Sequence, residues 1–247
     1  MGMKLSVGAG EAEYEVPPIG THKAICYRVV DAGTAEEEYQ GEKKNRHQIY
    51  LFWELPEHKM SDGRPMGVMT GYTASLNEKA KLYRDVTAWI NRSFTEAEKA
   101  GFDPSILCGK GCKVSVEHTA TGRAKVVAVH TAPNAFDENE NLRNLPTVNE
   151  QQVFDLEEYC KEFSGESDAS SKAMCDIFDE LPMFLRYRIA GCDEVGKEPQ
   201  PPCFELQAAL KRGEKAEQAS APAPARKAKP VEEESDEEGF FDDPVPF

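Results

Sequence analysis

Long apolar runs are absent from this sequence of 247 residues. No stretch of about 18 consecutive apolar residues occurs, so we expect no transmembrane helix. The first residues, Met1 to Ser6, lack the apolar stretch of a secretory signal peptide. Seven cysteines, an odd number scattered over a chain of this size, form no recognisable disulfide framework and are typical of a reducing compartment. We therefore expect a cytoplasmic protein without membrane contacts.

Catalytic and metal-binding motifs are also scarce. The sequence contains no zinc-protease helix and no nucleophile elbow, and Gly109-Lys110-Gly111 lacks the upstream Gly and the following Ser or Thr of a phosphate loop. Cys108, Cys112 and His118 are weak zinc candidates, because their spacing includes no Cys-x2-Cys pair. We predict a protein that is not an enzyme, with no catalytic residues, no metal site and no cofactor.

Positive charge is in short supply, with 29 Lys and Arg against 44 Asp and Glu and a net charge of −15. Taken alone, this balance argues against a nucleic-acid binder, whose phosphate contacts need Lys and Arg. The charge is unevenly distributed, however: residues 1–130 are neutral overall, residues 131–210 carry −11, residues 211–230 carry +4 and residues 231–247 carry −8. The N-terminal half is therefore a charge-balanced stretch that nucleic acid could approach.

The first 130 residues read as short strands with one helical insertion. Strand patterns cover residues 21–30, 48–55, 66–74, 112–118 and 124–130; on the second of these, Ile49, Leu51, Trp53 and Leu55 share one face while Tyr50 and Phe52 share the other. Between the third and fourth strands, Ser75-Leu76-Asn77-Glu78 fits a capping box, and an apolar stripe of helical period follows, made by Leu82, Val86, Trp89 and Ile90. This order predicts a mainly β, five-stranded OB-fold barrel with a helix between strands 3 and 4.

The remainder of the chain divides into two further regions. Residues 136–210 predict an acidic helical appendage with helices over 153–163 and 172–188, the second bent or divided by Pro182. Residues 211–247, rich in Ala, Pro, Lys and Glu, predict a disordered linker and acidic tail. The predicted domains are thus an OB-fold domain at 1–135, the appendage at 136–210 and the tail at 211–247.

An OB groove for single-stranded DNA needs aromatic rings for base stacking and local positive charge for phosphates. The aromatic candidates on the first three strands are Tyr27, Tyr50, Phe52 and Tyr72. Packing in a core is the alternative for each of these rings. The basic candidates near the same strands are Lys23, Arg28, Lys43, Lys44, Arg46 and Arg64. Further basic candidates on the last two strands are Lys113, Arg123 and Lys125. For these, the alternative is an ordinary solvated charge.

The chain ends in Asp242-Asp243-Pro244-Val245-Pro246-Phe247, which combines acidic residues, an aromatic ring and a free carboxylate. Such an end suits docking, with Phe247 in an apolar pocket and the carboxylates facing basic groups of a partner. It resembles the C-terminal tip of bacterial single-stranded DNA-binding proteins, apart from the extra Pro244. By that resemblance, we predict Asp242, Asp243, Pro246 and Phe247 as partner-binding residues.

Residues 18–135 are similar in layout to phage-encoded single-stranded DNA-binding proteins. The similar stretches are Gly20-Thr21, Asp31-Ala32-Gly33-Thr34, Phe52-Trp53-Glu54-Leu55 and Tyr72-Thr73-Ala74-Ser75-Leu76. The resemblance implies an OB-fold that binds single-stranded DNA without strong sequence preference during phage replication or recombination, in the cytoplasm of an infected bacterial host. It also implies that the tail recruits a polymerase, helicase, primase or recombination protein.

Two other functions stay open. The first is a replication or recombination adaptor that binds proteins rather than DNA. The second is a metal-dependent nuclease built on the acidic helical region, since acidic pairs are plentiful there although no motif arranges them. The charge blocks add one hypothesis to the DNA-binding reading: the −8 tail competes with DNA for the basic groove.

Overall fold

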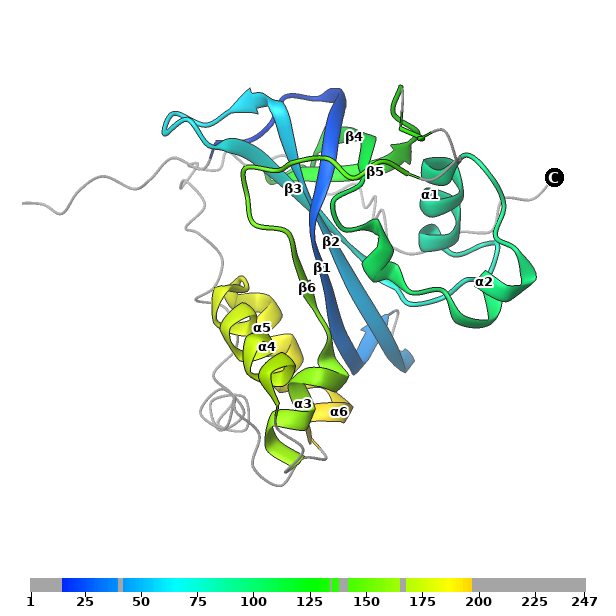
Figure 1. Ribbon diagram of the computed structural model, residues 1–247, viewed down its shortest axis with the longest axis vertical. Coiled ribbons are helices and arrows are strands. Elements are labelled where there is room, and N and C mark those ends of the chain that lie inside the picture. Colours follow the sequence, from blue (N-terminus) through cyan, green and yellow to red (C-terminus); the bar gives the residue numbers. More distant parts are fainter. Residues whose placement is uncertain (1–14, 40–41, 134, 138–141, 165–167, 197–247) are drawn as a thin grey trace, which may run out of the picture.

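The computed structural model describes residues 15–39, 42–133, 135–137, 142–164 and 168–196, and this part of the chain is mainly β (Figure 1). Its strands are β1 (Gly20–Tyr39), β2 (Glu42–Lys59), β3 (Pro65–Thr73), β4 (Gly111–His118), β5 (Ala124–His130) and β6 (Gln152–Phe154). Its helices are α1 (Lys81–Ile90), α2 (Glu96–Gly101), α3 (Leu156–Ser164), α4 (Ala169–Glu180), α5 (Met183–Ala190) and α6 (Asp193–Gly196). The five predicted strands and the helix between the third and fourth are present, but β1 and β2 extend well beyond the predicted 21–30 and 48–55, because residues 34–39 and 42–47 pair with each other in the ladder. The predicted tail lies outside the described residues.

The five longer strands form one sheet in the order β3-β2-β1-β4-β5, with every neighbouring pair antiparallel, and β6 pairs in parallel with β1. In the described part of the chain no ladder joins β3 to β5, so the sheet is open and the expected barrel is not closed. Lys81 of α1 spans this opening: its Nζ donates to Thr70 Oγ1 of β3 at 3.4 Å and to the Val126 carbonyl of β5 at 3.3 Å.

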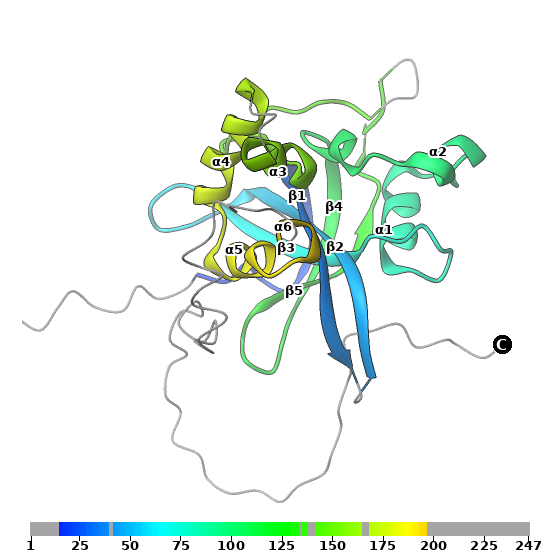
Figure 2. The same cartoon turned by 90° about the horizontal axis from the view of Figure 1, so that it is seen from below.

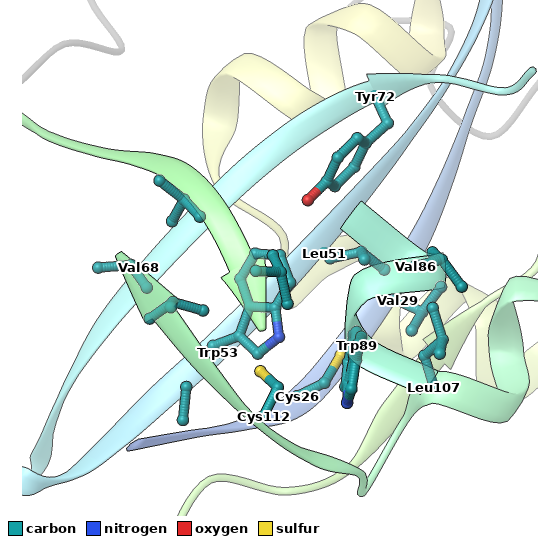
Figure 3. Packing of buried hydrophobic residues seen from close by; sticks show 14 of the residues in the cluster. Cys26, Val29, Leu51, Trp53, Val68, Tyr72, Val86, Trp89, Leu107 and Cys112 are labelled. Carbon is teal, nitrogen blue, oxygen red and sulfur yellow. The ribbon is translucent and has the colours of Figure 1, made fainter. Parts of the chain in front are cut away.

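One face of the sheet encloses the main core, which α1 covers. Leu51 and Trp53 of β2 pack there with Val86 and Trp89 of α1, as Figure 3 shows. The Trp89 indole N–H donates to the Gly111 carbonyl at 2.8 Å, which fixes the helix against β4. Strand alternation and helical period, both readable in the sequence, therefore place these side chains in one cluster, and the prediction that Ile49, Leu51, Trp53 and Leu55 share a face is confirmed.

The other face of β1 and β2 carries a second core. A register shift between Cys26 and Arg28 marks a bulge in β1, after which Val30 points away from the main core. Val30, Ala32 and Phe52 pack on this side against β6 and helices α3 to α6. In Figures 1 and 2 these helices lie on one side of the β1–β2 ribbon, and α1 and α2 lie on the other. We call β6 and α3 to α6 together the cover.

The cover differs from the prediction at its start. Residues Gln152–Phe154 form a strand rather than the first turn of a helix, because they pair with Arg28, Val29 and Val30 of β1. Pro182 divides the second predicted helix into α4 and α5, as expected from its missing N–H. No helix in the described ranges is long and apolar enough to span a membrane.

Candidate nucleic-acid interface

Tyr27, Tyr50 and Phe52 lie together on the face of β1 and β2 that the cover occupies. Phe52 is only 6% exposed, and its ring centroid is 6.2 Å from that of Tyr27. The Tyr50 ring meets Phe184 of α5 at 5.9 Å, and burial raises the pKa of the Tyr50 hydroxyl. The predicted shared face of Tyr50 and Phe52 is confirmed, but the cover buries Phe52 and half-buries Tyr27 and Tyr50, which leaves no open platform of rings for base stacking.

Polar contacts hold the two ends of the cover to the sheet. At one end, Arg28 lies over the Tyr27 and Phe52 rings and donates to Glu180 of α4 at 3.2 Å. At the other end, Arg188 of α5 donates to Glu37 of β1 at 2.8 Å. Both arginine side chains are largely buried. Each ion pair therefore fixes the position of a helix as well as neutralising a shielded charge.

The apolar contacts decide whether the cover gives way to DNA. Seven Phe, Leu, Ile and Val side chains of the cover are at most 5% exposed, and burial of each contributes about 1.5–3 kcal/mol, roughly 10–20 kcal/mol together. They are Phe154, Leu156, Phe178, Leu181, Leu185, Ile189 and Val195. If the cover were displaced, three bases stacked on the uncovered rings would contribute only roughly 3–9 kcal/mol of binding free energy. The cover therefore stays in place, with Phe52 buried beneath it and Tyr27 and Tyr50 half-buried.

Tyr72 does not fit its predicted stacking role either, because it belongs to the main core. It is 3% exposed, and its hydroxyl donates to Asp85 of α1 at 2.9 Å. The Lys81 Nζ lies 4.7 Å from the Tyr72 ring centroid and 3.5 Å from the Asp85 carboxylate (Figure 3 shows the Tyr72 ring). Burial raises the pKa of Asp85 and lowers the pKa of Lys81. This buried group joins α1 to β3.

The predicted basic residues of the first three strands are spread over the surface rather than gathered in one groove. Lys43, Lys44 and Arg46 lie in the part of the β1–β2 ladder nearest its hairpin, and Arg188 of the cover donates to the Arg46 carbonyl. Arg64 lies in the turn between β2 and β3, and Lys23 lies near the start of β1. The predicted groove across these strands is therefore not formed as one continuous surface.

Most of these charges have an acidic neighbour. Carboxylates lie within 2.7 Å of the Nζ of Lys23, Lys43 and Lys44 and of an Arg64 guanidinium nitrogen; the partners are Glu57, Glu36, Glu42 and Asp62. All eight side chains are about half exposed or more. Exposed ion pairs contribute about 0–1 kcal/mol, so they can be exchanged for contacts to phosphate.

The base of the β1–β2 ribbon holds a histidine between two carboxylates. The His47 Nε2 lies 2.7 Å from Asp31 Oδ1, and its Nδ1 lies 3.7 Å from Glu194 of α6. The hydrogen bond to Asp31 raises the pKa of His47, against the opposing effect of burial. Glu194 also accepts a hydrogen bond from the Thr34 backbone N–H at 2.8 Å. This cluster ties α6 to the ribbon.

The weak zinc candidates do not meet. Cys112 is buried in the main core, the Cys108 thiol faces the Tyr27 carbonyl at 3.5 Å, and His118 hydrogen-bonds the Pro17 carbonyl. Within the described ranges no group of three or more His, Cys, Asp and Glu side chains is arranged to hold a metal ion. The predicted partner-binding residues Asp242, Asp243, Pro246 and Phe247 lie outside the described residues.

Comparison with known proteins leaves the family open. A scan against models of protein families gives no match, and a search of curated proteins gives no match either.

Proposed function

We propose that this protein binds single-stranded DNA through an OB-fold, without strong sequence preference and without a chemical step. The observation that carries the proposal is the strand order β3-β2-β1-β4-β5 with α1 between β3 and β4. OB-folds are five-stranded Greek-key barrels that are partly open, and they bind oligonucleotides. The opening between β3 and β5, which Lys81 spans, is compatible with that description.

The proposed biological role is in phage replication or recombination. The protein coats exposed single strands, and its acidic tip recruits a polymerase, helicase, primase or recombination protein. The support for the second part is the sequence of the tip alone, which ends in Asp-Asp-Pro-Val-Pro-Phe.

The covered aromatic face has a consequence for how DNA is held. Since Phe52 and Tyr72 are buried and Tyr50 contacts Phe184, phosphate contacts supply most of the binding free energy. Such contacts release counterions, and for a single strand the logarithm of the affinity falls with the logarithm of salt concentration by about 0.7 per contact. Binding is therefore expected to depend strongly on salt and weakly on base identity.

The direct test is fluorescence anisotropy of a labelled oligo-dT, with a duplex of the same length as control, at about 50 and 200 mM salt. The proposal predicts binding to the single strand that weakens with salt, and weaker binding to the duplex. A flat titration at the lower salt concentration would contradict it. Stronger binding to the duplex would contradict it as well.

A second candidate function is an adaptor that binds replication proteins and does not touch DNA. The burial of Phe52 and Tyr72 and the cover over Tyr27 and Tyr50 favour it, because these rings are not free to stack on bases. This function predicts a flat oligo-dT titration together with capture of a replication protein that is lost in a Phe247→Ala variant.

A further inference from the structure

Three basic residues lie in register across the outer face of β1, β4 and β5. In the antiparallel ladders Lys23 of β1 is opposite Lys113 of β4, and Lys113 is opposite His130 of β5. Directly opposite residues share a face, so these side chains form a row across three strands, which we call the basic row. With about 4.8 Å between neighbouring strands, the row is roughly 10 Å long.

The basic row faces away from both cores. The residues that alternate with it, Ala24, Cys112 and Val129, are buried in the main core. Lys23 and His130 are exposed and Lys113 is partly exposed. The cover packs on a different part of the sheet, against β1 beyond its bulge and against β2. This row is therefore open to a ligand while the aromatic face is closed.

Neighbouring carboxylates neutralise this row only in part. Like charges placed directly opposite one another on a sheet destabilise it, so the Lys23–Lys113 pair is unfavourable without an anion. Lys23 contacts Glu57 at 2.7 Å, but their side chains are 63% and 52% exposed and the pair is weak. Lys113 makes no ion pair with a carboxylate of the described residues. The row could therefore bind an external anion.

Hydroxyl groups lie next to the row on the same face. Thr21 is opposite Ser115 in the ladder, and their hydroxyl oxygens are 2.9 Å apart. The Ser115 hydroxyl is also 3.2 Å from the His130 Nε2. Lysine ammonium groups and Ser and Thr hydroxyl groups are side-chain groups that commonly contact phosphate oxygens.

We propose that the basic row, with Thr21 and Ser115, holds the phosphate backbone of single-stranded DNA. This inference rests on the proposed function and deepens it: DNA crosses β1, β4 and β5 instead of the face of β2 and β3 on which OB-folds usually bind oligonucleotides. The bases point away from the sheet, since the row has no Phe, Tyr or Trp ring, and recognition is limited to the backbone.

The test compares two double variants of the full chain by oligo-dT anisotropy at about 50 and 200 mM salt. Lys23→Gln with Lys113→Gln removes two charges from the row. Lys79→Gln with Lys172→Gln removes two charges from exposed residues elsewhere and is the matched control. The row variant is expected to bind about tenfold more weakly at the lower salt concentration, with a salt slope smaller by about 1.4. The control is expected to bind like the wild type.

The outcomes separate the two proposals. If the wild type binds oligo-dT and the row and control variants bind it with equal affinity, the inference that the basic row holds DNA is wrong, while the proposed function stands. Tighter binding by the row variant would mean that the row holds the acidic tail, a competing polyanion, and would also overturn the inference. If the wild type does not bind oligo-dT, both the proposed function and the role of the basic row are wrong. Thermal unfolding checks that the row variant folds, and relief of the Lys23–Lys113 repulsion is expected to leave its stability unchanged or higher.

Discussion

Leu185→Ala tests whether the cover is an integral part of the fold. Leu185 of α5 is fully buried in the second core, where Val30 and Phe52 of the sheet also pack. Truncation of a fully buried Leu costs about 2–5 kcal/mol, from lost transfer free energy and from the cavity left behind. We expect the free energy of unfolding to fall by that amount. Met183→Ala on the same helix, at a side chain that is 38% exposed, is the control and should cost far less.

The two tryptophans make this measurement specific. Trp53 and Trp89 both lie in the main core, on the opposite side of the sheet from Leu185. Tryptophan fluorescence during urea denaturation therefore reports the unfolding of the main core alone. If the cover is integral, Leu185→Ala shifts this transition to lower urea concentration. A tryptophan transition that stays in place while the helical circular dichroism signal is lost earlier would refute the reasoning, because the cover would then open independently.

Three further predictions concern other parts of the chain. Tyr72→Phe should destabilise the protein by about 1–3 kcal/mol in urea denaturation, because the buried Asp85 carboxylate loses a hydrogen-bond donor, and it should leave oligo-dT affinity unchanged. The raised pKa of His47 favours its protonated form in the folded state, so its contribution is fully present below about pH 6.5 and is lost as pH rises through the folded pKa. Urea denaturation should therefore show that His47→Gln costs more stability at about pH 6 than at about pH 8, which lie on either side of the ordinary histidine pKa. An equal cost at both pH values would contradict this prediction. Deletion of residues 231–247, which carry −8, should tighten oligo-dT binding most at low salt, and unchanged or weaker binding would argue against tail competition.

Local periodicity predicted much of the fold. Alternation along residues 48–55 correctly separated the main-core face of β2 from the face that carries Tyr50 and Phe52. The capping box expected at Ser75 and Glu78 does not form: α1 begins at Lys81, and the Ser75 hydroxyl accepts a hydrogen bond from the Asn77 backbone N–H. The structure has a capping box at Thr95 and Glu98, at the start of α2. A helix start depends on where its apolar stripe meets the sheet, which a local motif does not encode.

The candidate site was harder to predict, because it depends on contacts between distant segments. Tyr72 has the same parity as Val68 in β3, and that signal could have placed it in the core. For Tyr50 and Phe52 the sequence indicated a face but not what lies on it. Phe178, Leu181 and Leu185 form an apolar stripe at helical spacing in the sequence. Their packing against Phe52 of β2, however, depends on the fold of the whole chain. The alignment of Lys23 with Lys113 likewise follows from ladder register between strands far apart in the sequence.

The most direct test of this account is lysine acetylation footprinting of the full chain with and without saturating oligo-dT. The account predicts that DNA slows acetylation of Lys23 and Lys113 and leaves Lys79 and Lys172 unchanged. Equal acetylation rates with and without DNA at all four lysines would contradict it, and so would protection at Lys172 on the cover with none at Lys113.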